Sequence, residues 1–143
     1  MIWLTKDLVL LIHDGLLAKY GGLPGILNEG ALEATLARPR HLLAYGKKPD
    51  LAALAGAYAF GLACKHAFAD GNKRTSLLGT MIFLARNEAV LLSNERELVE
   101  TWERLGAGKM SETDISAWIR ARLTNPSLGN PPPPARDASK KRG

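Results

Sequence analysis

Hydrophobic residues recur at helical spacing along most of the chain, and the first such series follows Thr5. Its apolar members lie three or four positions apart, at Leu8, Leu11, Ile12, Leu16 and Leu17. This spacing predicts an amphipathic helix over residues 6–20 that ends at Gly21-Gly22. A second, shorter helix is predicted over residues 29–37, because Pro39 disfavours helical backbone in the residue before it. Residues 38–49 are then expected to form an irregular connection.

The middle of the chain carries two strongly apolar stretches. The first, residues 51–65, is apolar almost all round and follows Asp50, which is a good N-cap residue. Such a pattern predicts a central helix that is buried on several sides. The second stretch predicts a helix over residues 72–87. Its inward side chains are expected to be Leu77, Leu78, Met81, Ile82 and Leu84.

Two capping signals predict the remaining helices. Asn94 precedes Glu97 by three residues and predicts a helix over residues 95–105, and Ser111 with Asp114 predicts a final helix ending near residue 123. Short strands are conceivable only at residues 2–4 and 90–92. We therefore expect an all-α fold class, a compact bundle of about six helices with at most a very short β element.

The composition changes after residue 124. Residues 125–143 contain Pro126, Gly129 and the run 131–134 of four prolines, followed by a polar end. Such a sequence favours stiff extended backbone over packed structure. We expect residues 1–124 to form one catalytic domain and residues 125–143 to form a proline-rich, basic and disordered tail.

Composition limits the classes of function. The chain has 143 residues, 46% of them hydrophobic and 23% charged, as in an ordinary globular protein. Cys64 is the single cysteine, which excludes an internal disulfide and the usual thiolate set of a zinc site. The first residues lack the features of a signal peptide, and the apolar runs are shorter than the ~20 residues that span a bilayer. These features predict a cytoplasmic protein with no membrane partner.

The positive charge is concentrated in the last nine residues. The formal net charge is +5, of which residues 135–143 contribute +3, so the body of the chain carries 5 − 3 = +2. A nearly neutral body lacks the broad basic surface that a nucleic-acid-binding domain presents. We therefore do not expect direct binding of nucleic acid.

Residues 66–75 place a possible proton acceptor, a carboxylate, a turn glycine and two cations closer together than any other stretch of the chain. Their order is His-Ala-Phe-Ala-Asp-Gly-Asn-Lys-Arg-Thr. Gly71 falls where a loop must turn into a helix, and its missing Cβ lets a ligand approach the backbone. Lys73 and Arg74 would then lie in the first helical turn, where the helix dipole disfavours cations. A bound anion such as phosphate, held by these two cations and by the free N–H groups of the turn, would offset this unfavourable interaction.

Two further residues of this segment, His66 and Asp70, could take part in catalysis. His66 could accept a proton from a hydroxyl group, the usual role of a catalytic histidine, although a lone histidine is more often simply packed. Asp70 could hold Mg²⁺ if a nucleotide supplied the other ligands, or it could cap the helix or pair with Arg74. Phe68 is expected to anchor the loop in the core, and we group it with the nucleotide-binding residues Gly71, Asn72, Lys73 and Arg74.

Other familiar sites do not fit the sequence. A P-loop requires Gly-Lys-Ser or Gly-Lys-Thr after a strand, whereas here Asn72 intervenes and a helix comes before. A zincin motif needs a second histidine nearby. Cys64 lies in an apolar helix, where a thiolate is disfavoured. His13 and His41 have no catalytic neighbours in the sequence and are expected to be structural or surface residues.

The segment resembles the active-site motif of the Fic/Doc superfamily, and more closely that of its Doc (death-on-curing) toxin branch. The Fic pattern is His-Pro-Phe-x-Asp/Glu-Gly-Asn-Gly-Arg-x-x-Arg, and here Lys73 replaces the second glycine and Leu77 the last arginine. The likeness covers about residues 5–92. It includes, upstream of the motif, Gly21-Gly22, Gly25, the run 30–33 (Gly-Ala-Leu-Glu) and Arg38-Pro39.

The resemblance implies a protein kinase that uses ATP and Mg²⁺. Doc-like proteins transfer the γ-phosphate of ATP to a threonine of elongation factor Tu and so halt translation. The same resemblance implies that His66 is the general base, Asp70 the Mg²⁺ ligand, and Asn72, Lys73 and Arg74 the phosphate holders, with Gly71 lending backbone N–H groups. Such transfer needs mainly positioning and charge neutralisation.

The resemblance also implies a way to inhibit the toxin. Many Fic proteins carry an inhibitory Ser/Thr-x-x-x-Glu-Gly/Asn helix, but here Leu98 follows the nearest match, residues 93–97. A separate Phd-like antitoxin, whose disordered segment folds on binding, is the expected partner. Two alternatives stay open: a Fic-type adenylyl transferase that modifies a protein hydroxyl, and a non-catalytic module that binds nucleotide or antitoxin.

Overall fold

Six α-helices make up the bundle in the computed structural model, which describes residues 1–46 and 48–124. The all-α prediction is confirmed. The proposed tail, residues 125–143, lies outside the described residues, so the domain boundary stays a prediction. In chain order the elements are α1 (Lys6–Tyr20), α2 (Glu29–Tyr45), α3 (Leu51–Cys64), α4 (Asn72–Arg86), β1 (Val90–Leu91), α5 (Glu95–Gly106), α6 (Glu112–Arg120) and β2 (Leu123–Thr124).

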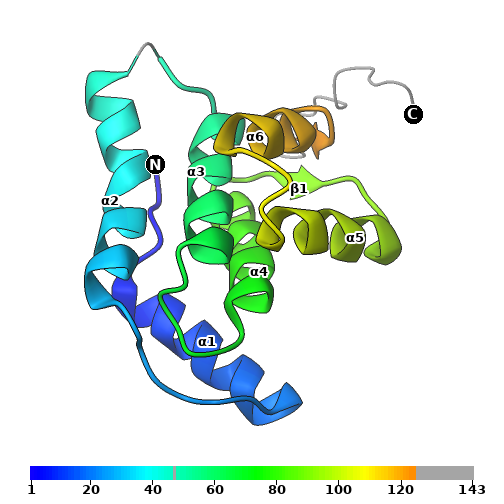
Figure 1. The fold of residues 1–143 in the computed structure, drawn as a ribbon. Helices are drawn as coiled ribbons and strands as arrows, with labels where there is room; N and C mark the ends of the chain where they lie inside the picture. The colour runs from blue at the N-terminus through cyan, green and yellow to red at the C-terminus, as the bar shows by residue number, and fades with distance from the viewer. Residues whose placement is uncertain (47, 125–143) are drawn as a thin grey trace.

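Helix α3 occupies the centre of the bundle, as predicted, with α2, α4 and α6 packed around it (Figure 1). Asp50 caps its first turn by accepting a hydrogen bond from the N–H of Ala53 at 2.9 Å. Small residues let neighbours approach closely. A Cβ placed on Gly56 would come within 1.9 Å of the Ser116 Oγ of α6, so only glycine fits there.

Helix α2 is longer than the sequence predicts. It runs through Pro39 to Tyr45, so the predicted helix end at residue 37 and the irregular connection from residue 38 are wrong. Contacts with other elements hold the second half of the helix despite the N–H that proline lacks. Pro39 is itself buried, and the neighbouring Arg38 forms an ion pair with Glu112 of α6. Tertiary packing has overridden a local helix-stop signal.

Helix α4 begins and ends close to its predicted bounds, but its inward face differs from the prediction. Leu84 is buried as expected and Leu77 and Ile82 are half-buried, whereas Leu78 and Met81 are exposed. Close packing against α3 instead favours small residues on the inner face. The buried positions of α4 are Thr75, Ser76, Gly79, Thr80, Phe83 and Leu84.

The β element is a single antiparallel ladder that ties the end of the described chain to the bundle. β1 pairs with β2 in the register Val90 opposite Thr124 and Leu91 opposite Leu123. The short strand expected at residues 90–92 is therefore confirmed. The one expected at residues 2–4 is wrong, because the backbone of Ile2 bonds to the side chain of Asn87 instead.

The two final helices follow their capping signals in part. Ser111 and Asp114 form the complete reciprocal capping box of α6, although that helix ends at Arg120 rather than near residue 123. Asn94 caps α5, but the Glu97 carboxylate bonds to Ser93 and Arg122 instead of returning to Asn94. Arg122 thereby links the segment after α6 to the start of α5.

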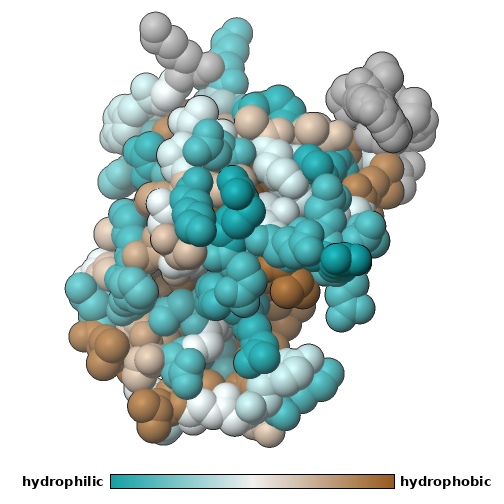
Figure 2. Space-filling model, turned by 45° about the vertical axis from the view of Figure 1, so that its right-hand side comes forward, coloured by the Kyte–Doolittle hydropathy of each residue, from teal (hydrophilic) through white to brown (hydrophobic). Residues whose placement is uncertain are grey.

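The surface is mainly hydrophilic on the face shown in Figure 2, where apolar colour is confined to a few small areas. Among the residues that the structure describes, no helix is both long enough and apolar enough to cross a membrane.

Candidate active site

The N-terminus of α4 differs from the other helix starts in the described part of the chain. Side chains of Thr5, Asn28, Asp50, Asn94 and Ser111 cap the other five helices. Helix α4 has Gly71 at this position, with no side-chain cap and no acidic residue in its first turn. Gly71 adopts φ +78, a left-handed conformation that glycine accepts without strain. The free N–H groups and the positive end of the dipole are thus left to attract an anion.

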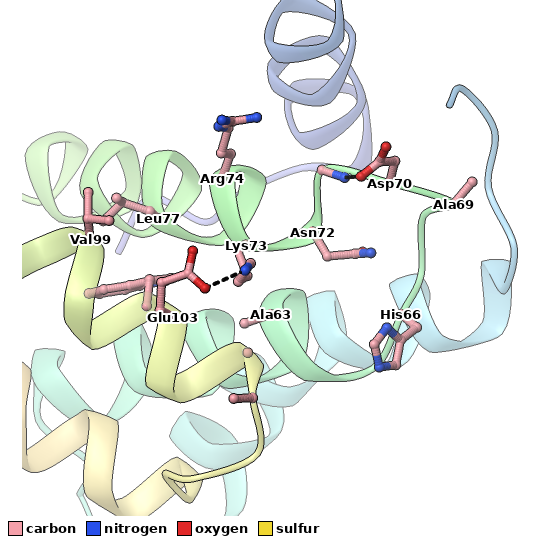
Figure 3. A pocket seen from close by; sticks show the side chains of 14 residues that line it. Ala63, His66, Ala69, Asp70, Asn72, Lys73, Arg74, Leu77, Val99 and Glu103 are labelled. Atoms are coloured by element: carbon pink, nitrogen blue, oxygen red, sulfur yellow. Dashed lines mark hydrogen bonds and ion pairs between the residues drawn. The ribbon is translucent and has the colours of Figure 1, made fainter. Parts of the chain in front are cut away.

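A pocket of about 540 Å³ opens in front of this helix end. Its walls are the loop that leads into α4, the first turn of α4 and the C-terminal half of α5 (Figure 3). Six of the predicted site residues line it: His66, Asp70, Gly71, Asn72, Lys73 and Arg74. The structure therefore brings together in one cavity nearly all the residues that the sequence motif suggested.

Backbone hydrogen bonds to residues 25–28 hold in place the loop that leads into α4. The N–H groups of Leu27 and Asn28 both donate to the Ala67 carbonyl, at 2.8 and 3.1 Å. The Ala69 N–H donates to the Gly25 carbonyl at 3.0 Å. Residues 25–28 and 67–69 thus run as a short antiparallel pair, although they are some forty positions apart in the sequence.

Phe68 anchors the loop in the core, as predicted. Its side chain is 1% exposed, stacks on the His13 ring with centroids 3.8 Å apart, and does not line the pocket. The buried His13 contacts the next part of the loop as well: its Nε2 lies 2.8 Å from the Asp70 carbonyl, a bond that requires the proton on Nε2. His13 is a structural residue, as expected, but one that positions the site.

His66 faces the pocket from the loop side. Its backbone has φ +51, which is uncommon for a residue with a side chain and is typical of functional turns. Within residues 1–46 and 48–124 no group forms a hydrogen bond to its imidazole, and the side chain is exposed. Both ring nitrogens are therefore accessible to an incoming substrate.

The Asp70 carboxylate lies beside the loop at residues 22–23. Its Oδ1 accepts from the Gly71 N–H at 2.9 Å and its Oδ2 accepts from the Leu23 N–H at 3.3 Å. Each oxygen keeps a lone pair for another partner. No cluster of three or more His, Cys, Asp or Glu residues suited to a metal occurs in the described ranges. Asp70 thus fits a Mg²⁺ ion only as one protein ligand among phosphate and water oxygens.

Asn72 braces the loop through its side-chain amide. Its Oδ1 accepts from the Phe68 N–H at 3.1 Å, and its Nδ2 donates to the Phe68 carbonyl at 3.0 Å. These two bonds hold the side chain against the loop, and the second N–H of Nδ2 and the backbone N–H of Asn72 remain for a ligand.

Lys73 and Arg74 point to different sides of α4 (Figure 3). The Lys73 Nζ donates to the Glu103 Oε1 of α5 at 2.6 Å. The Arg74 guanidinium lies over the ring of Tyr20 in α1, with Cζ 4.3 Å from the centroid. The structure places both cations on the pocket wall but does not bring them together.

Several residues of the site could not be found from the motif. Glu103, Trp102 and Gly106 of α5 line the pocket, and Tyr20 supports Arg74.

Cys64 is not suited to act as a nucleophile. Burial raises the pKa of the Cys64 thiol, and its Sγ donates to the Leu105 carbonyl at 3.1 Å, so the thiolate form is disfavoured.

The amino-acid sequence matches a known family. Residues 3–84 match the family model described as the Fic/DOC family, and the chain belongs to that family. Among curated proteins it is similar to the Protein kinase doc of Escherichia phage P1. The two are 31% identical over 117 residues, which cover 82% of this chain and 92% of the phage protein. Within the family the chain stands in the Doc branch.

Proposed function

We propose that this protein is the toxin of a toxin–antitoxin pair and acts as a Doc-type kinase in the cytoplasm. It transfers the γ-phosphate of ATP to a threonine or serine hydroxyl of a translation factor, with elongation factor Tu as the expected target, and so arrests translation. The similarity to a protein named a protein kinase supports the reaction class.

The uncapped N-terminus of α4 is the observation that carries the proposal. Its free N–H groups, together with Lys73 and the left-handed Gly71, form a cradle suited to phosphate oxygens at the mouth of a pocket. The described residues form no large nucleotide domain. Phosphoryl transfer does not require one, because its catalysis rests mainly on positioning and on neutralising charge.

The pocket residues take the following roles in this reaction. His66 accepts the proton of the target hydroxyl as its oxygen forms a bond to the γ-phosphorus, while the bond from that phosphorus to the β,γ-bridging oxygen breaks and ADP leaves. The helix N–H groups and Lys73 hold the phosphates. Asp70 would hold Mg²⁺, which would help to neutralise the negative charge of the phosphate groups.

Two positions favour phosphoryl over adenylyl transfer. Lys73 places a charged side chain on the pocket wall where the Fic pattern has glycine, and the half-buried Leu77 lines the wall where that pattern has arginine. Arg74 is turned toward Tyr20 and gives no second cation on the Lys73 side. The site therefore lacks the glycine and the last arginine of the Fic pattern, which favours transfer of the terminal phosphate over adenylyl transfer.

The proposed partner is a Phd-like antitoxin that docks in a groove beside the pocket. This groove, of about 640 Å³, lies between α1, α4 and α5, and exposed apolar side chains such as Leu11, Leu78 and Met81 line it. Arg74, Leu77 and Val99 belong to both cavities. An amphipathic helix of the antitoxin seated there would therefore also cover the entrance of the pocket.

Transfer from labelled ATP tests the proposed reaction. Purified protein is incubated with elongation factor Tu and with ATP labelled at either the α or the γ position. Label from the γ position alone should appear on the factor. Label from the α position alone would establish the adenylyl transferase instead, and nucleotide binding with neither transfer nor toxicity would establish the non-catalytic module.

Two histidine variants test the proposed base. His66→Ala should lower transfer by about 10²–10⁴-fold, the usual contribution of a general base. His41→Ala is the matched control, because His41 is exposed on α2 and its ring lies edge-on to that of Tyr45, outside the pocket. A His66→Ala variant that arrests growth as strongly as the parent protein contradicts the assignment.

The antitoxin groove has its own test. Leu11→Glu places a charge in the groove at a side chain that is 68% exposed, so folding should be preserved. Cells should then be arrested by the variant even when the antitoxin is present. Leu43→Glu, at an exposed position of α2 outside the groove, should stay neutralised. Full neutralisation of the Leu11 variant rules out this docking site.

A further inference from the structure

Lys73 stands at an unfavourable place for a cation. It is in the first turn of α4, where the helix dipole and the free N–H groups repel positive charge. The side chain nevertheless has a defined position, with its Nζ 2.6 Å from the Glu103 carboxylate. The two side chains are 46% and 61% exposed, and an exposed ion pair contributes little to folding by itself. Its place at the pocket suggests a different role.

A second, independent feature of α5 fits the same side chain. Gly106, one turn after Glu103, leaves a notch that the aliphatic stem of Lys73 occupies. A Cβ built on Gly106 would lie 2.6 Å from the Lys73 Cδ and 2.7 Å from its Cγ. Real Cβ atoms do not approach other atoms so closely, so the stem could not keep this path beside any other residue.

The end of α5 also supplies favourable electrostatics. Gly106 is the last residue of α5, and the C-terminus of a helix carries partial negative charge. Lys73 therefore lies between the positive end of α4 and the negative end of α5. Glu103 and Gly106 both fall outside residues 3–84, the part of the chain that the family model matches.

We propose that Glu103 and Gly106 form a seat for Lys73 and act as positioning residues for the phosphate cradle. Gly106 provides the space for the stem, and Glu103 fixes the ammonium group at the pocket wall. The use of this seat in catalysis rests on the proposed function, whereas the seat itself does not. A lysine side chain is flexible, so without such a seat its charge would be spread over many positions.

Two substitutions separate the two halves of the seat. Gly106→Ala adds the Cβ that meets the Lys73 stem, and the helical backbone at this position accepts alanine. Glu103→Gln keeps the shape of the side chain and removes its charge. Gly30→Ala is the matched control, because an added Cβ there, near the start of α2, makes only an ordinary contact 3.5 Å from the Asn28 Oδ1.

Lysine NMR tests the seat without any nucleotide. The protein is labelled with ¹³C-lysine, and the Cε signal of Lys73 is assigned from its loss in Lys73→Arg. Both seat variants should shift this signal toward that of a free lysine and leave the other lysine signals in place. Gly30→Ala should leave the Lys73 signal unchanged. A Lys73 signal that neither Glu103→Gln nor Gly106→Ala moves overturns the proposal, whatever the activity of the protein.

ATP binding, measured by titration calorimetry, tests whether the seat serves the site. Gly106→Ala should weaken binding about tenfold, since misplacing a binding group by an ångström is costly. In a Lys73→Met background the same substitution should have no further effect. An undiminished loss in that background would mean that Gly106 acts through the general structure of α5, and would contradict its positioning role. Lack of ATP binding by the parent protein would instead contradict the proposed function, while the NMR result would still decide the seat.

Discussion

Two buried hydrogen bonds in series, called the relay below, join α3, α4 and α5 behind the pocket. The indole Nε1–H of Trp102 in α5 donates to the Ser76 Oγ of α4 at 2.9 Å, and this hydroxyl donates to the Ala59 carbonyl of α3 at 2.7 Å. Trp102 is 2% exposed and Ser76 is fully buried. Because Trp102 lines the pocket, the relay fixes the wall that α5 contributes.

Ser76→Ala should lower the free energy of unfolding by about 2 kcal/mol. Leaving the Trp102 N–H buried without a partner costs about 1–3 kcal/mol, and losing the bond to Ala59 costs about 1 kcal/mol more. The removed hydroxyl no longer has to be desolvated, which offsets part of that loss. For a folded domain of this size, such a change corresponds to a fall in Tm of about 8 °C.

Urea unfolding followed by tryptophan fluorescence measures this effect, with an unchanged m-value as the sign that only stability has changed. Ser116→Ala is the control, because the Ser116 hydroxyl donates only to the Glu112 carbonyl one turn earlier in its own helix. In a Trp102→Phe background, which has no indole donor, Ser76→Ala should cost markedly less. A Ser76→Ala variant as stable as Ser116→Ala would refute the reasoning that the indole depends on this hydroxyl.

Two further predictions concern the loop and the acid stability of the fold. Gly22→Ala should destabilise the protein by about 1–2 kcal/mol, because φ is +125 there. Its added Cβ would lie 2.9 Å from the Asp70 Oδ2, so Mg²⁺-dependent ATP binding, measured by calorimetry, should weaken as well; equal binding by variant and parent would argue against Asp70 as the metal ligand. Arg122 and then Ser93 lower the pKa of Glu97 below its ordinary value of 4.5, so this group stabilises the fold above about pH 4.5 and the contribution disappears as the pH falls through the lowered pKa. Glu97→Gln should accordingly show a flatter loss of stability in acid unfolding curves than the parent, and parallel curves would mean that the ion pair does not contribute.

The fold could be predicted wherever a local signal decided it. The caps at Asp50, Asn94 and Ser111 and the apolar spacing after Thr5 lie within a few residues of the helices they start. Prediction failed where distant contacts decided. Pro39 stays helical because the rest of α2 packs on the bundle, and the partner of β1 is a strand some thirty residues away.

The candidate site divides in the same way. Its chemical groups are contiguous in the motif, so their shared pocket could be expected from the sequence. Their partners could not, because His13 reaches the Asp70 carbonyl across 57 positions and Glu103 reaches Lys73 across 30. The pairing of the Asn72 amide with the Phe68 backbone could not be read from the motif either.

The seat of Lys73 places a constraint on how the length of α5 can vary during evolution. One residue inserted into a helix rotates everything beyond it by about 100°. An insertion between β1 and the first turn of α5 can be absorbed by the loop, whereas one within the helix ahead of Glu103 would turn both the carboxylate and the Gly106 notch away from α4. We therefore expect relatives with a lysine at this motif position to keep the spacing inside α5 and to vary in the segments that flank it.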